Sequence, residues 1–393
     1  MYNPDKRFQV HFELTNKCQA SCPNCARYLR GKPLPWMDTR DLSLQDVQKI
    51  MSNSCILDKC DVLYCGNYGD PAASRDLISI VEWFKDQPFV SEKDYTEEGW
   101  LKDPIPRHQY INTNGGLRDE LFWKNLAKSL PNERLHHGAV TFSIDGLEDT
   151  NHIYRRNVSW KQLWRNLNSY IDAGGKATWE YLVFGHNKHQ VEEARVLAKT
   201  MGMEFRLKNP LGLDEVENTE TVSYLHAFDK DHNYEYSITS ADSGIAGTVF
   251  LSSLGGKIEP SFREGKIIAS DKEIKQSSMS NIDCKSLSTE KYTEKQDIYI
   301  RSDGRVLPCC FMDGTVEQRG NDKFSFYQMR ETILDAGNKL DVINNDLDEV
   351  IFGETFKKTF FDPMKLNSLE EGKPMYCVET CGPLSEFDLI YKK

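Results

Sequence analysis

The 393-residue sequence lacks a long apolar run. No stretch approaches the roughly 20 apolar residues that a membrane-spanning helix needs. Residues 1–17, MYNPDKRFQVHFELTNK, contain no signal-peptide core. An excess of positive charge is also missing, because 49 Lys and Arg stand against 60 Asp and Glu, for a net charge of −11. We therefore expect a soluble cytoplasmic protein with no membrane partner and no sequence-independent binding of nucleic acid.

The sequence also lacks a plausible disulfide framework. Its eleven cysteines are an odd number, and clustered cysteines in a reducing compartment more often bind metal. Hydrophobic residues make up 39% of the chain, which is enough to build a core. The cysteines fall into three groups, which are Cys18, Cys22 and Cys25; Cys55, Cys60 and Cys65; and Cys284, Cys309, Cys310, Cys377 and Cys381.

Short apolar strands alternate with amphipathic helices over residues 1–210. One helix pattern begins after Ser43, which forms a capping box with Asp46, and two others cover residues 160–171 and 191–201. Repeated strand–helix–strand units predict a parallel, right-handed α/β fold. Six units give a partial (β/α)6 barrel, since a closed barrel needs eight. The six strands are expected at Phe8–Leu14, Asp61–Cys65, Gln109–Thr113, Ala139–Asp145, Ala177–Phe184 and Glu204–Lys208.

Composition divides the chain into three parts. Residues 1–213 form the predicted barrel. Residues 214–279 are polar and acidic, and we expect an elaborated connection there, with short strands at Gly247–Leu251 and Lys266–Ile268. Residues 280–393 hold the last cysteine group and are expected to form a small α+β domain.

A β-hairpin is expected inside the C-terminal part. Its first strand ends at Ser302, Asp303-Gly304 makes the turn, and Arg305–Leu307 forms the return strand. Cys309 then follows directly on the return strand.

Polar loops follow four of the predicted strands. Cys18 begins the first, Gly66-Asn67-Tyr68-Gly69-Asp70-Pro71 forms the second, Asn112–Gly116 the third, and Asp145-Gly146 the fourth. Catalytic groups of βα barrels lie at the carboxyl ends of the strands, so four such loops indicate one shared site. The alternative is that these residues merely make turns.

The first cysteine group has the spacing Cys18-x3-Cys22-x2-Cys25 and directly follows a strand. Three close thiolates can hold three irons of a cubane cluster and leave the fourth iron for an outside ligand. A zinc site is an alternative, but it needs a fourth Cys or His, and the nearby His11 lies in the strand. Buried thiols without metal are a further alternative.

This cysteine loop resembles the signature of the radical S-adenosylmethionine (SAM) superfamily, and the resemblance covers residues 8–210 in order. It implies a [4Fe–4S] cluster on the three cysteines, with SAM chelating the unique iron. Reductive cleavage of SAM then gives a 5′-deoxyadenosyl radical that abstracts a substrate hydrogen. It also implies a one-electron reductant such as flavodoxin or ferredoxin as a partner.

The same resemblance implies further SAM contacts. The glycine-rich loop, where Asp70 replaces the usual Glu, would hold the amino group, and Ser143 and Asp145 the ribose. Either Arg155 or Arg156 would pair with the carboxylate, and a solvated helix face is the alternative for both. Phe184 and Gly185 would line the adenine pocket. The full set implied in this way is Gly66, Asn67, Tyr68, Gly69, Asp70, Asn114, Ser143, Asp145, Arg155 and Arg156.

The Gly304-x4-Cys309 element resembles the SPASM and twitch extensions of radical SAM enzymes. Five cysteines in this region, rather than seven, favour the shorter twitch pattern with one auxiliary [4Fe–4S] cluster. Cys310 would point the other way along the strand, and a structural zinc with the same four thiolates is the alternative. The implied ligands are Cys284, Cys309, Cys377 and Cys381.

The middle cysteines Cys55, Cys60 and Cys65 are interpreted as small core residues, with Cys65 the candidate to face the cavity. Three functions remain open. The first is radical SAM modification or oxidation of a peptide or protein, and the second is the same chemistry on a nucleotide or sugar. The third is a non-enzymatic, zinc-stabilised binding protein, which explains the cysteines but not the polar loops.

Overall fold

The three-dimensional structure is a computed structural model. It describes residues 1–29, 32–34, 37, 40–89, 107–130, 140–210, 214–215, 223–231, 233–241, 248–249, 282, 284–287, 295–313, 333, 335–368, 371–374, 377 and 381. No helix within these ranges is both long and apolar enough to cross a membrane.

An eight-stranded sheet forms the centre of the molecule, in the order β14-β13-β1-β4-β5-β6-β7-β8. All neighbours are parallel except β13 and β14. The six strands predicted for the barrel occur in the predicted order, with ends that differ from the expected ones by two residues or fewer. They are β1 (Arg7–Phe12), β4 (Cys60–Tyr64), β5 (Gln109–Thr113), β6 (Val140–Ser143), β7 (Ala177–Leu182) and β8 (Glu204–Lys208).

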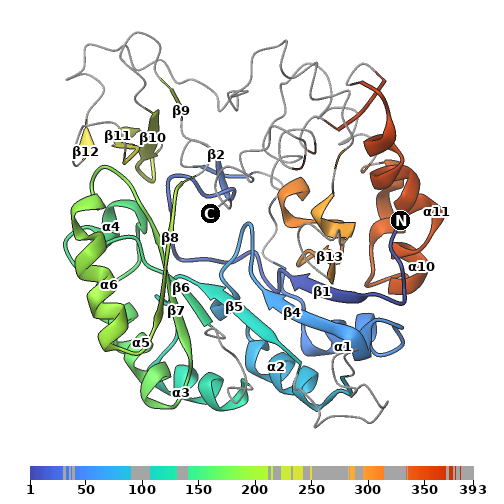
Figure 1. The fold of residues 1–393 in the computed structure, drawn as a ribbon, viewed down its shortest axis with the longest axis horizontal. Helices are drawn as coiled ribbons and strands as arrows, with labels where there is room; N and C mark the ends of the chain where they lie inside the picture. The colour runs from blue at the N-terminus through green and yellow to red at the C-terminus, as the bar shows by residue number, and fades with distance from the viewer. Residues whose placement is uncertain are drawn as a thin grey trace, which may run out of the picture.

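Helices line one side of this curved sheet (Figure 1). The predicted capping box is present, since the Ser43 side chain accepts from the Asp46 amide and Asp46 accepts from the Ser43 amide. Such a cap stabilises a helix by about 1 kcal/mol. The helices that connect the barrel strands are α1 (Leu44–Met51), α2 (Leu77–Asp86), α3 (Glu120–Ser129), α4 (Asn151–Tyr154), α5 (Trp160–Asp172) and α6 (Val191–Thr200).

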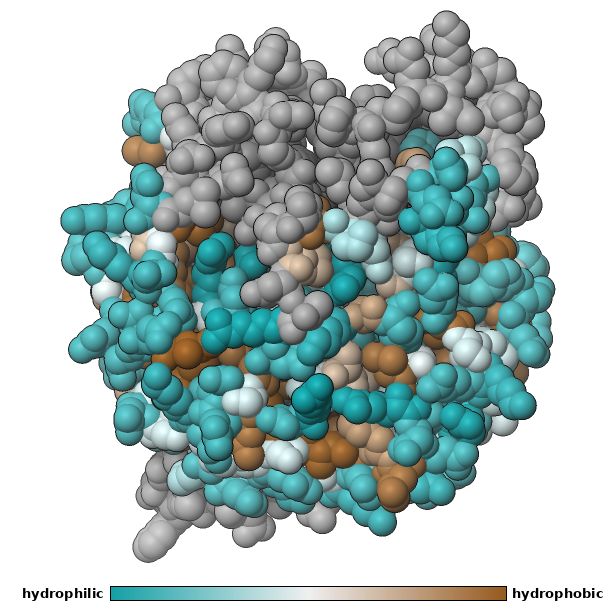
Figure 2. Space-filling view, turned by 180° about the vertical axis from the view of Figure 1, so that it is seen from behind, coloured by the Kyte–Doolittle hydropathy of each residue, from teal (hydrophilic) through white to brown (hydrophobic). Residues whose placement is uncertain are grey.

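Large aromatic side chains fill the space between sheet and helices. Trp123 of α3, Phe142 of β6 and Tyr170 of α5 are all fully buried. The Trp123 and Phe142 ring centroids are 5.3 Å apart, and those of Phe142 and Tyr170 are 5.8 Å apart. The apolar faces predicted from helical spacing therefore do pack onto the sheet. On the outside, Figure 2 shows a mixture of hydrophilic and hydrophobic residues over the described surface.

The predicted hairpin forms, but it belongs to the main sheet. β13 (Lys295–Ile300) pairs in parallel with β1, and β14 (Val306–Leu307) returns antiparallel to β13. Gly304 has φ +87°, a value that suits glycine in the turn. The domain boundary expected at residue 280 stays a prediction, and the hairpin that follows it in sequence pairs with the barrel sheet through β1. Sequence alone did not reveal that the apolar strand β13 covers the open edge of β1.

The acidic connection also contains more structure than predicted. A four-stranded antiparallel sheet joins β9 (Asp214–Glu215), β10 (Ser223–Phe228), β11 (Tyr234–Thr239) and β12 (Thr248–Val249). β12 lies inside the strand expected at Gly247–Leu251, whereas Lys266–Ile268 lies outside the described residues. The two longer strands were missed because their alternation is weak amid polar residues. The Gly185 amide donates to the Thr239 carbonyl at 2.9 Å, which attaches this sheet to the loop after β7.

The remaining described elements are short. Figure 1 places the C-terminal helices beside the N-terminus and β1, away from α3 and α5. Tyr2 packs edge-on against Phe361, with ring centroids 5.1 Å apart. The strands and α-helices not yet named are β2 (Tyr28–Leu29), β3 (Lys32–Pro33), α10 (Leu347–Ile351) and α11 (Glu354–Phe356).

Candidate functional site

The three N-terminal cysteines lie in the loop that leaves β1 at the carboxyl edge of the sheet. Cys22 is buried, and Cys18 and Cys25 are half-buried. Burial raises the pKa of all three thiols, that of Cys25 to about 11. Neighbouring cysteines raise the pKa of Cys18 and of Cys25 further. The structure thus brings the three predicted thiols together in a partly enclosed position.

Polar hydrogens surround these thiols. The Asn114 Nδ2 atom lies 3.5 Å from the Cys18 Sγ atom, and the Ala20 amide lies 3.4 Å from the same sulfur. The Arg155 Nη1 atom lies 3.9 Å from the Cys22 Sγ atom. Donors and a cation at this range lower the pKa of a thiol and so oppose the effect of burial, and thiolates are the form that binds metal.

The two candidate arginines have different surroundings. Arg155 faces the cysteines, and its Nε atom lies 2.6 Å from Oδ2 of the fully buried Asp145. Arg156 instead forms an ion pair with Glu235 and lies over the Tyr236 ring, on the β9–β12 sheet. Burial alone would lower the pKa of Arg155, but Asp145 and Cys22 raise it above its usual value. Arg155 is therefore a fixed cation beside the cysteine loop.

The loop Gly66–Asp70, called the glycine loop below, runs against the cysteine loop. A Cβ atom on Gly69 would overlap the Thr15 carbonyl, and one on Gly66 would lie 2.7 Å from a Glu13 carboxylate oxygen. The Asn67 carbonyl lies 4.0 Å from the Cys25 Sγ atom. Both glycines are thus needed for close approach of two backbones.

Asp70 lies at the end of this loop and is buried. Its carboxylate accepts from the Thr113 hydroxyl at 2.8 Å, the Asn114 amide at 2.8 Å and the Ala72 amide at 2.9 Å. These contacts tie the loop after β4 to the loop after β5. Asp70 is therefore a loop-positioning residue in the structure, and a direct bond to SAM stays a prediction.

The strand-four pair shows a similar difference. Ser143 is half-buried at the end of β6, next to β7. Asp145 is buried, and besides Arg155 its Oδ1 atom accepts from the Leu182 amide at 2.6 Å. Asp145 orients Arg155, while Ser143 remains a predicted ribose contact.

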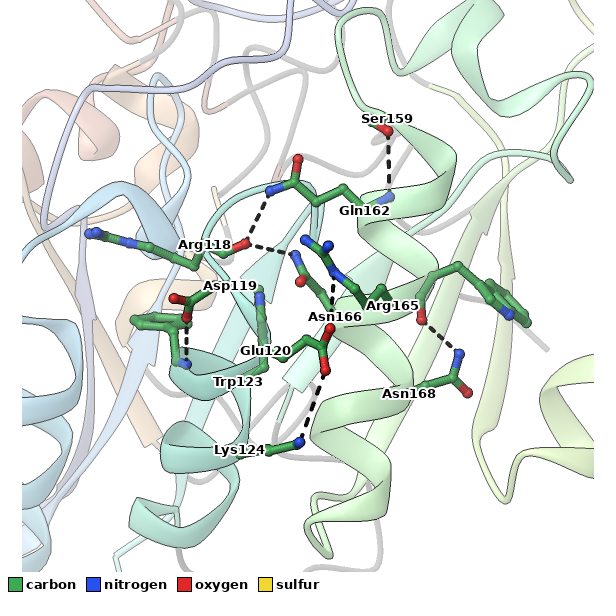
Figure 3. A network of polar contacts seen from close by, with 12 residues as sticks. Arg118, Asp119, Glu120, Trp123, Lys124, Ser159, Gln162, Arg165, Asn166 and Asn168 are labelled. Carbon is green, nitrogen blue, oxygen red and sulfur yellow. Dashed lines mark hydrogen bonds and ion pairs between the residues drawn. The ribbon is translucent and has the colours of Figure 1, made fainter.

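Arg118, which sequence analysis did not identify, holds the segment after the glycine loop in place through hydrogen bonds. Its side chain donates to the carbonyls of Ala72 at 2.6 Å and Ser74 at 2.7 Å. Its own carbonyl accepts from Gln162 and Asn166 of α5, as Figure 3 shows. Its φ of +66° is rare for a non-glycine residue, so sequence carries no signal for this role.

Two further buried polar residues were also missed. Glu13 is 1% exposed, and its Oε1 atom accepts from the amides of Tyr68 at 2.7 Å and Gly69 at 3.2 Å. His186 is 2% exposed after β7 and stacks on the Phe184 ring, with centroids 5.5 Å apart. Among the described residues, neither ring nitrogen of His186 has a hydrogen-bond partner, and burial lowers its pKa to about 4. An acidic residue beside an apolar strand was the available signal for Glu13.

The C-terminal cysteines predicted to act together lie near one another. Burial raises the pKa of Cys377, and the thiols of Cys284, Cys309 and Cys381 raise it further. Burial likewise raises the pKa of Cys284 to about 12. Burial raises the pKa of the Cys310 thiol, and Cys309 and Cys65 raise it further. Across the described ranges, no three His, Cys, Asp or Glu side chains are arranged to hold a single metal ion.

The middle cysteines do not share one environment. Cys60 is buried and Cys65 is half-buried, but Cys55 is exposed. The interpretation of Cys55 as a core residue is therefore wrong, because α1 ends at Met51 and Cys55 follows in a surface turn. The Cys65 carbonyl accepts from the His11 Nε2 atom of β1 at 2.8 Å.

Comparison with known proteins gives a fold-level likeness. No protein-family model and no curated protein sequence matches the chain. Among solved structures it is similar to Streptococcus suis SuiB bound to S-adenosylmethionine, at 12% identity over 93% of this chain and 72% of that one, with a TM-score of 0.46. It is also similar to anSMEcpe with bound AdoMet, at 16% identity, 93% and 85% coverage and a TM-score of 0.47. At such identities and scores, the functional argument rests on the chain's own residues.

Proposed function

We propose that this chain is a radical SAM enzyme that holds a [4Fe–4S] cluster on Cys18, Cys22 and Cys25 and cleaves SAM reductively. One observation carries the proposal. The three thiols lie in one loop at the carboxyl edge of a parallel sheet, with Arg155 of the Arg155–Asp145 pair beside Cys22 and the glycine loop beside Cys25. Zinc stabilisation alone gives no reason for that surrounding arrangement.

The residues present fit such a group. Cluster ligation needs anionic sulfur, and Asn114, the Ala20 amide and Arg155 offer donors to the sulfurs of Cys18 and Cys22. When bound, the reduced cluster supplies the electron that converts SAM to a 5′-deoxyadenosyl radical.

The chain's own residues then bind and orient. Arg155 is placed to pair with the SAM carboxylate, because Asp145 fixes its guanidinium while its Nη1 edge faces the cysteine loop. Backbone carbonyls of the glycine loop are proposed to hold the SAM amino group, and Ser143 the ribose. Asp70 links the loops after β4 and β5 through its hydrogen bonds.

We further propose an auxiliary [4Fe–4S] cluster on Cys284, Cys309, Cys377 and Cys381, in a region that corresponds to a twitch extension. The mutual electrostatic effect of the four thiols supports this grouping. Net oxidation of a peptide or protein is the proposed outcome, with flavodoxin or ferredoxin as reductant and the cytoplasm as location. The acidic segment 214–279, whose β9–β12 sheet joins the rim beside Arg156, is the proposed docking surface.

Metal analysis tests the proposal directly. After anaerobic reconstitution, we expect about eight irons per chain with matching sulfide, since two four-iron clusters are proposed. The triple variant Cys18→Ala, Cys22→Ala, Cys25→Ala should keep about four irons and form no 5′-deoxyadenosine. Stoichiometric zinc without acid-labile sulfide, or 5′-deoxyadenosine from the triple variant, would rule the assignment out.

A further inference from the structure

A buried network joins the glycine loop to the C-terminal hairpin. Glu13 Oε1 holds the amides of Tyr68 and Gly69. Its other oxygen, Oε2, accepts from the Tyr299 hydroxyl of β13 at 2.5 Å. The same hydroxyl lies 3.3 Å from the Asp313 carboxylate, which follows Cys309 by one helical turn. A chain of hydrogen bonds thus runs from one cysteine region to the other.

Direct contacts reinforce this connection. The Asn67 Nδ2 atom donates to the Cys310 carbonyl at 2.6 Å, and the Tyr68 hydroxyl donates to the Asp313 carbonyl at 3.4 Å. The Arg301 guanidinium lies over the Tyr68 ring, 5.9 Å from its centroid. Each residue from Asn67 to Gly69 is therefore held by a group that belongs, or is bonded, to the segment 299–313.

The charges make the network sensitive to the loss of any member. Arg301 donates to Asp313 at 2.9 Å and pairs with Asp303 at 3.1 Å, while Glu13 lies on the far side of Tyr299. Glu13, Tyr299 and Asp313 are at most 2% exposed. Buried carboxylates need their donors, so removing the Tyr299 hydroxyl leaves Glu13 without its 2.5 Å donor, while Asp313 keeps Arg301.

We propose that Glu13 and Tyr299 are positioning residues that set the glycine loop against the segment 309–313, so that the two cysteine regions are held in one arrangement. Naming the glycine loop as a SAM-binding element rests on the proposed function. The consequence is reciprocal coupling: a ligand that orders the glycine loop also orders the segment 309–313, and the reverse.

Hydrogen exchange on the full chain measures this coupling. In Tyr299→Phe, the amides of Tyr68 and Gly69 should exchange about tenfold faster, because their acceptor Glu13 has lost its own donor. Tyr170→Phe is the matched control, since it removes a hydroxyl of α5 that donates to the Lys176 carbonyl and should leave these amides unchanged. Unchanged protection in a folded Tyr299→Phe would overturn the proposal.

A second variant covers a failure to fold. Asp313→Asn keeps the side-chain shape but removes the carboxylate, and it should give the same increase in exchange at Tyr68 and Gly69. Glu13→Gln should keep most of the protection that Glu13→Ala loses, because the amide retains an oxygen acceptor. Equal loss in Gln and Ala variants would contradict the assignment of the acceptor role to Glu13.

The coupling itself requires a readout that a merely structural role would not change. Added SAM should slow exchange over residues 309–313 in the wild-type holoprotein, and by much less in Tyr299→Phe. If SAM protects this segment equally in both, the coupling is absent. If the protein binds no SAM at all, the proposed function fails, and the exchange at Tyr68 and Gly69 still decides the positioning role.

Discussion

The half-buried Arg155 and the buried Asp145 form an ion pair, with 2.6 Å between Nε and Oδ2, and the Arg155 Nη1 atom lies 3.9 Å from the Cys22 Sγ atom. Asp145 is fully buried, and burial raises its pKa while Arg155 lowers it. Asp145 therefore holds the Arg155 cation in a fixed orientation beside the cysteine loop. Arg156, the next residue in sequence, pairs with Glu235 instead.

Replacing Arg155 by Lys should weaken SAM binding by about tenfold or more, because Lys cannot reach Asp145 and a carboxylate ligand with one planar group. Arg156→Lys is the matched control. It changes an ion pair with Glu235 on the outer sheet, and SAM affinity should change by less than about threefold. Calorimetry on the anaerobically reconstituted protein gives both values. Equal effects of the two substitutions would contradict the placement of Arg155.

The sequence predicted the barrel well because its signals are local. Alternating strands and helices, the Ser43 cap and the Asp303–Gly304 turn each depend on a few neighbouring residues. The cysteine loop was likewise recognisable from spacing. What could not be predicted depends on contacts far apart in the chain, such as the pairing of β13 with β1 or the bond between Tyr299 and Glu13, 286 residues away.

Asp70 illustrates why a correct location gives an incomplete role. From the sequence, the residue lies in a rim loop, where truncation should leave the fold unaffected. In the structure, its carboxylate accepts three hydrogen bonds while buried. The sequence alone does not distinguish a loop residue that binds another loop from one that binds a ligand, because the distinction depends on which groups lie nearby in the folded structure.

Asp70→Asn should therefore reduce the free energy of unfolding by about 1–3 kcal/mol, since one acceptor oxygen becomes a donor that faces other donors. Ser143→Ala, at the end of β6, should cost less than about 1 kcal/mol. Urea denaturation of both variants checks this difference. A fully stable Asp70→Asn with lost SAM affinity would instead support a direct contact with SAM.

Glu13 should give the protein a characteristic pH dependence. Burial raises its pKa from 4.5 to about 7, Asp313 adds to this, and the bonds from Tyr299 and Tyr68 oppose it. Between these two values the folded protein keeps a proton that the unfolded chain has released. Stability contributed by this group is thus full below pH 4.5 and falls as the pH rises toward 7, by up to about 3 kcal/mol.

Glu13→Gln removes this titration. The difference in unfolding free energy between wild type and variant should change across that window and become constant above about pH 7. Taking the difference cancels other groups, including Asp297, whose pKa burial also raises to about 7. Urea denaturation from pH 5 to 8 provides the curve. A difference that is independent of pH would show that Glu13 does not titrate in this window.

Cys309→Ala should separate the two proposed clusters. Iron should fall from about eight to about four per chain, because one auxiliary ligand is lost. Reduced protein with SAM should still form 5′-deoxyadenosine, since Cys18, Cys22 and Cys25 are untouched. Cys310→Ala is the matched control one residue along, because Cys310 is not one of the four proposed ligands, and its iron content should stay near that of the wild type.

Two causes could remove the second cluster in Cys309→Ala, and limited proteolysis distinguishes them. If only the ligand is lost, the hairpin should stay protected, because β13 remains paired with β1 through six residues. If metal binding supplies the folding free energy of this region, the segment after Leu307 should become sensitive to protease while the barrel stays intact. Full iron content in Cys309→Ala together with iron loss in Cys310→Ala would show that Cys310 is the cluster ligand. The assignment of Cys309 as a ligand would then be wrong.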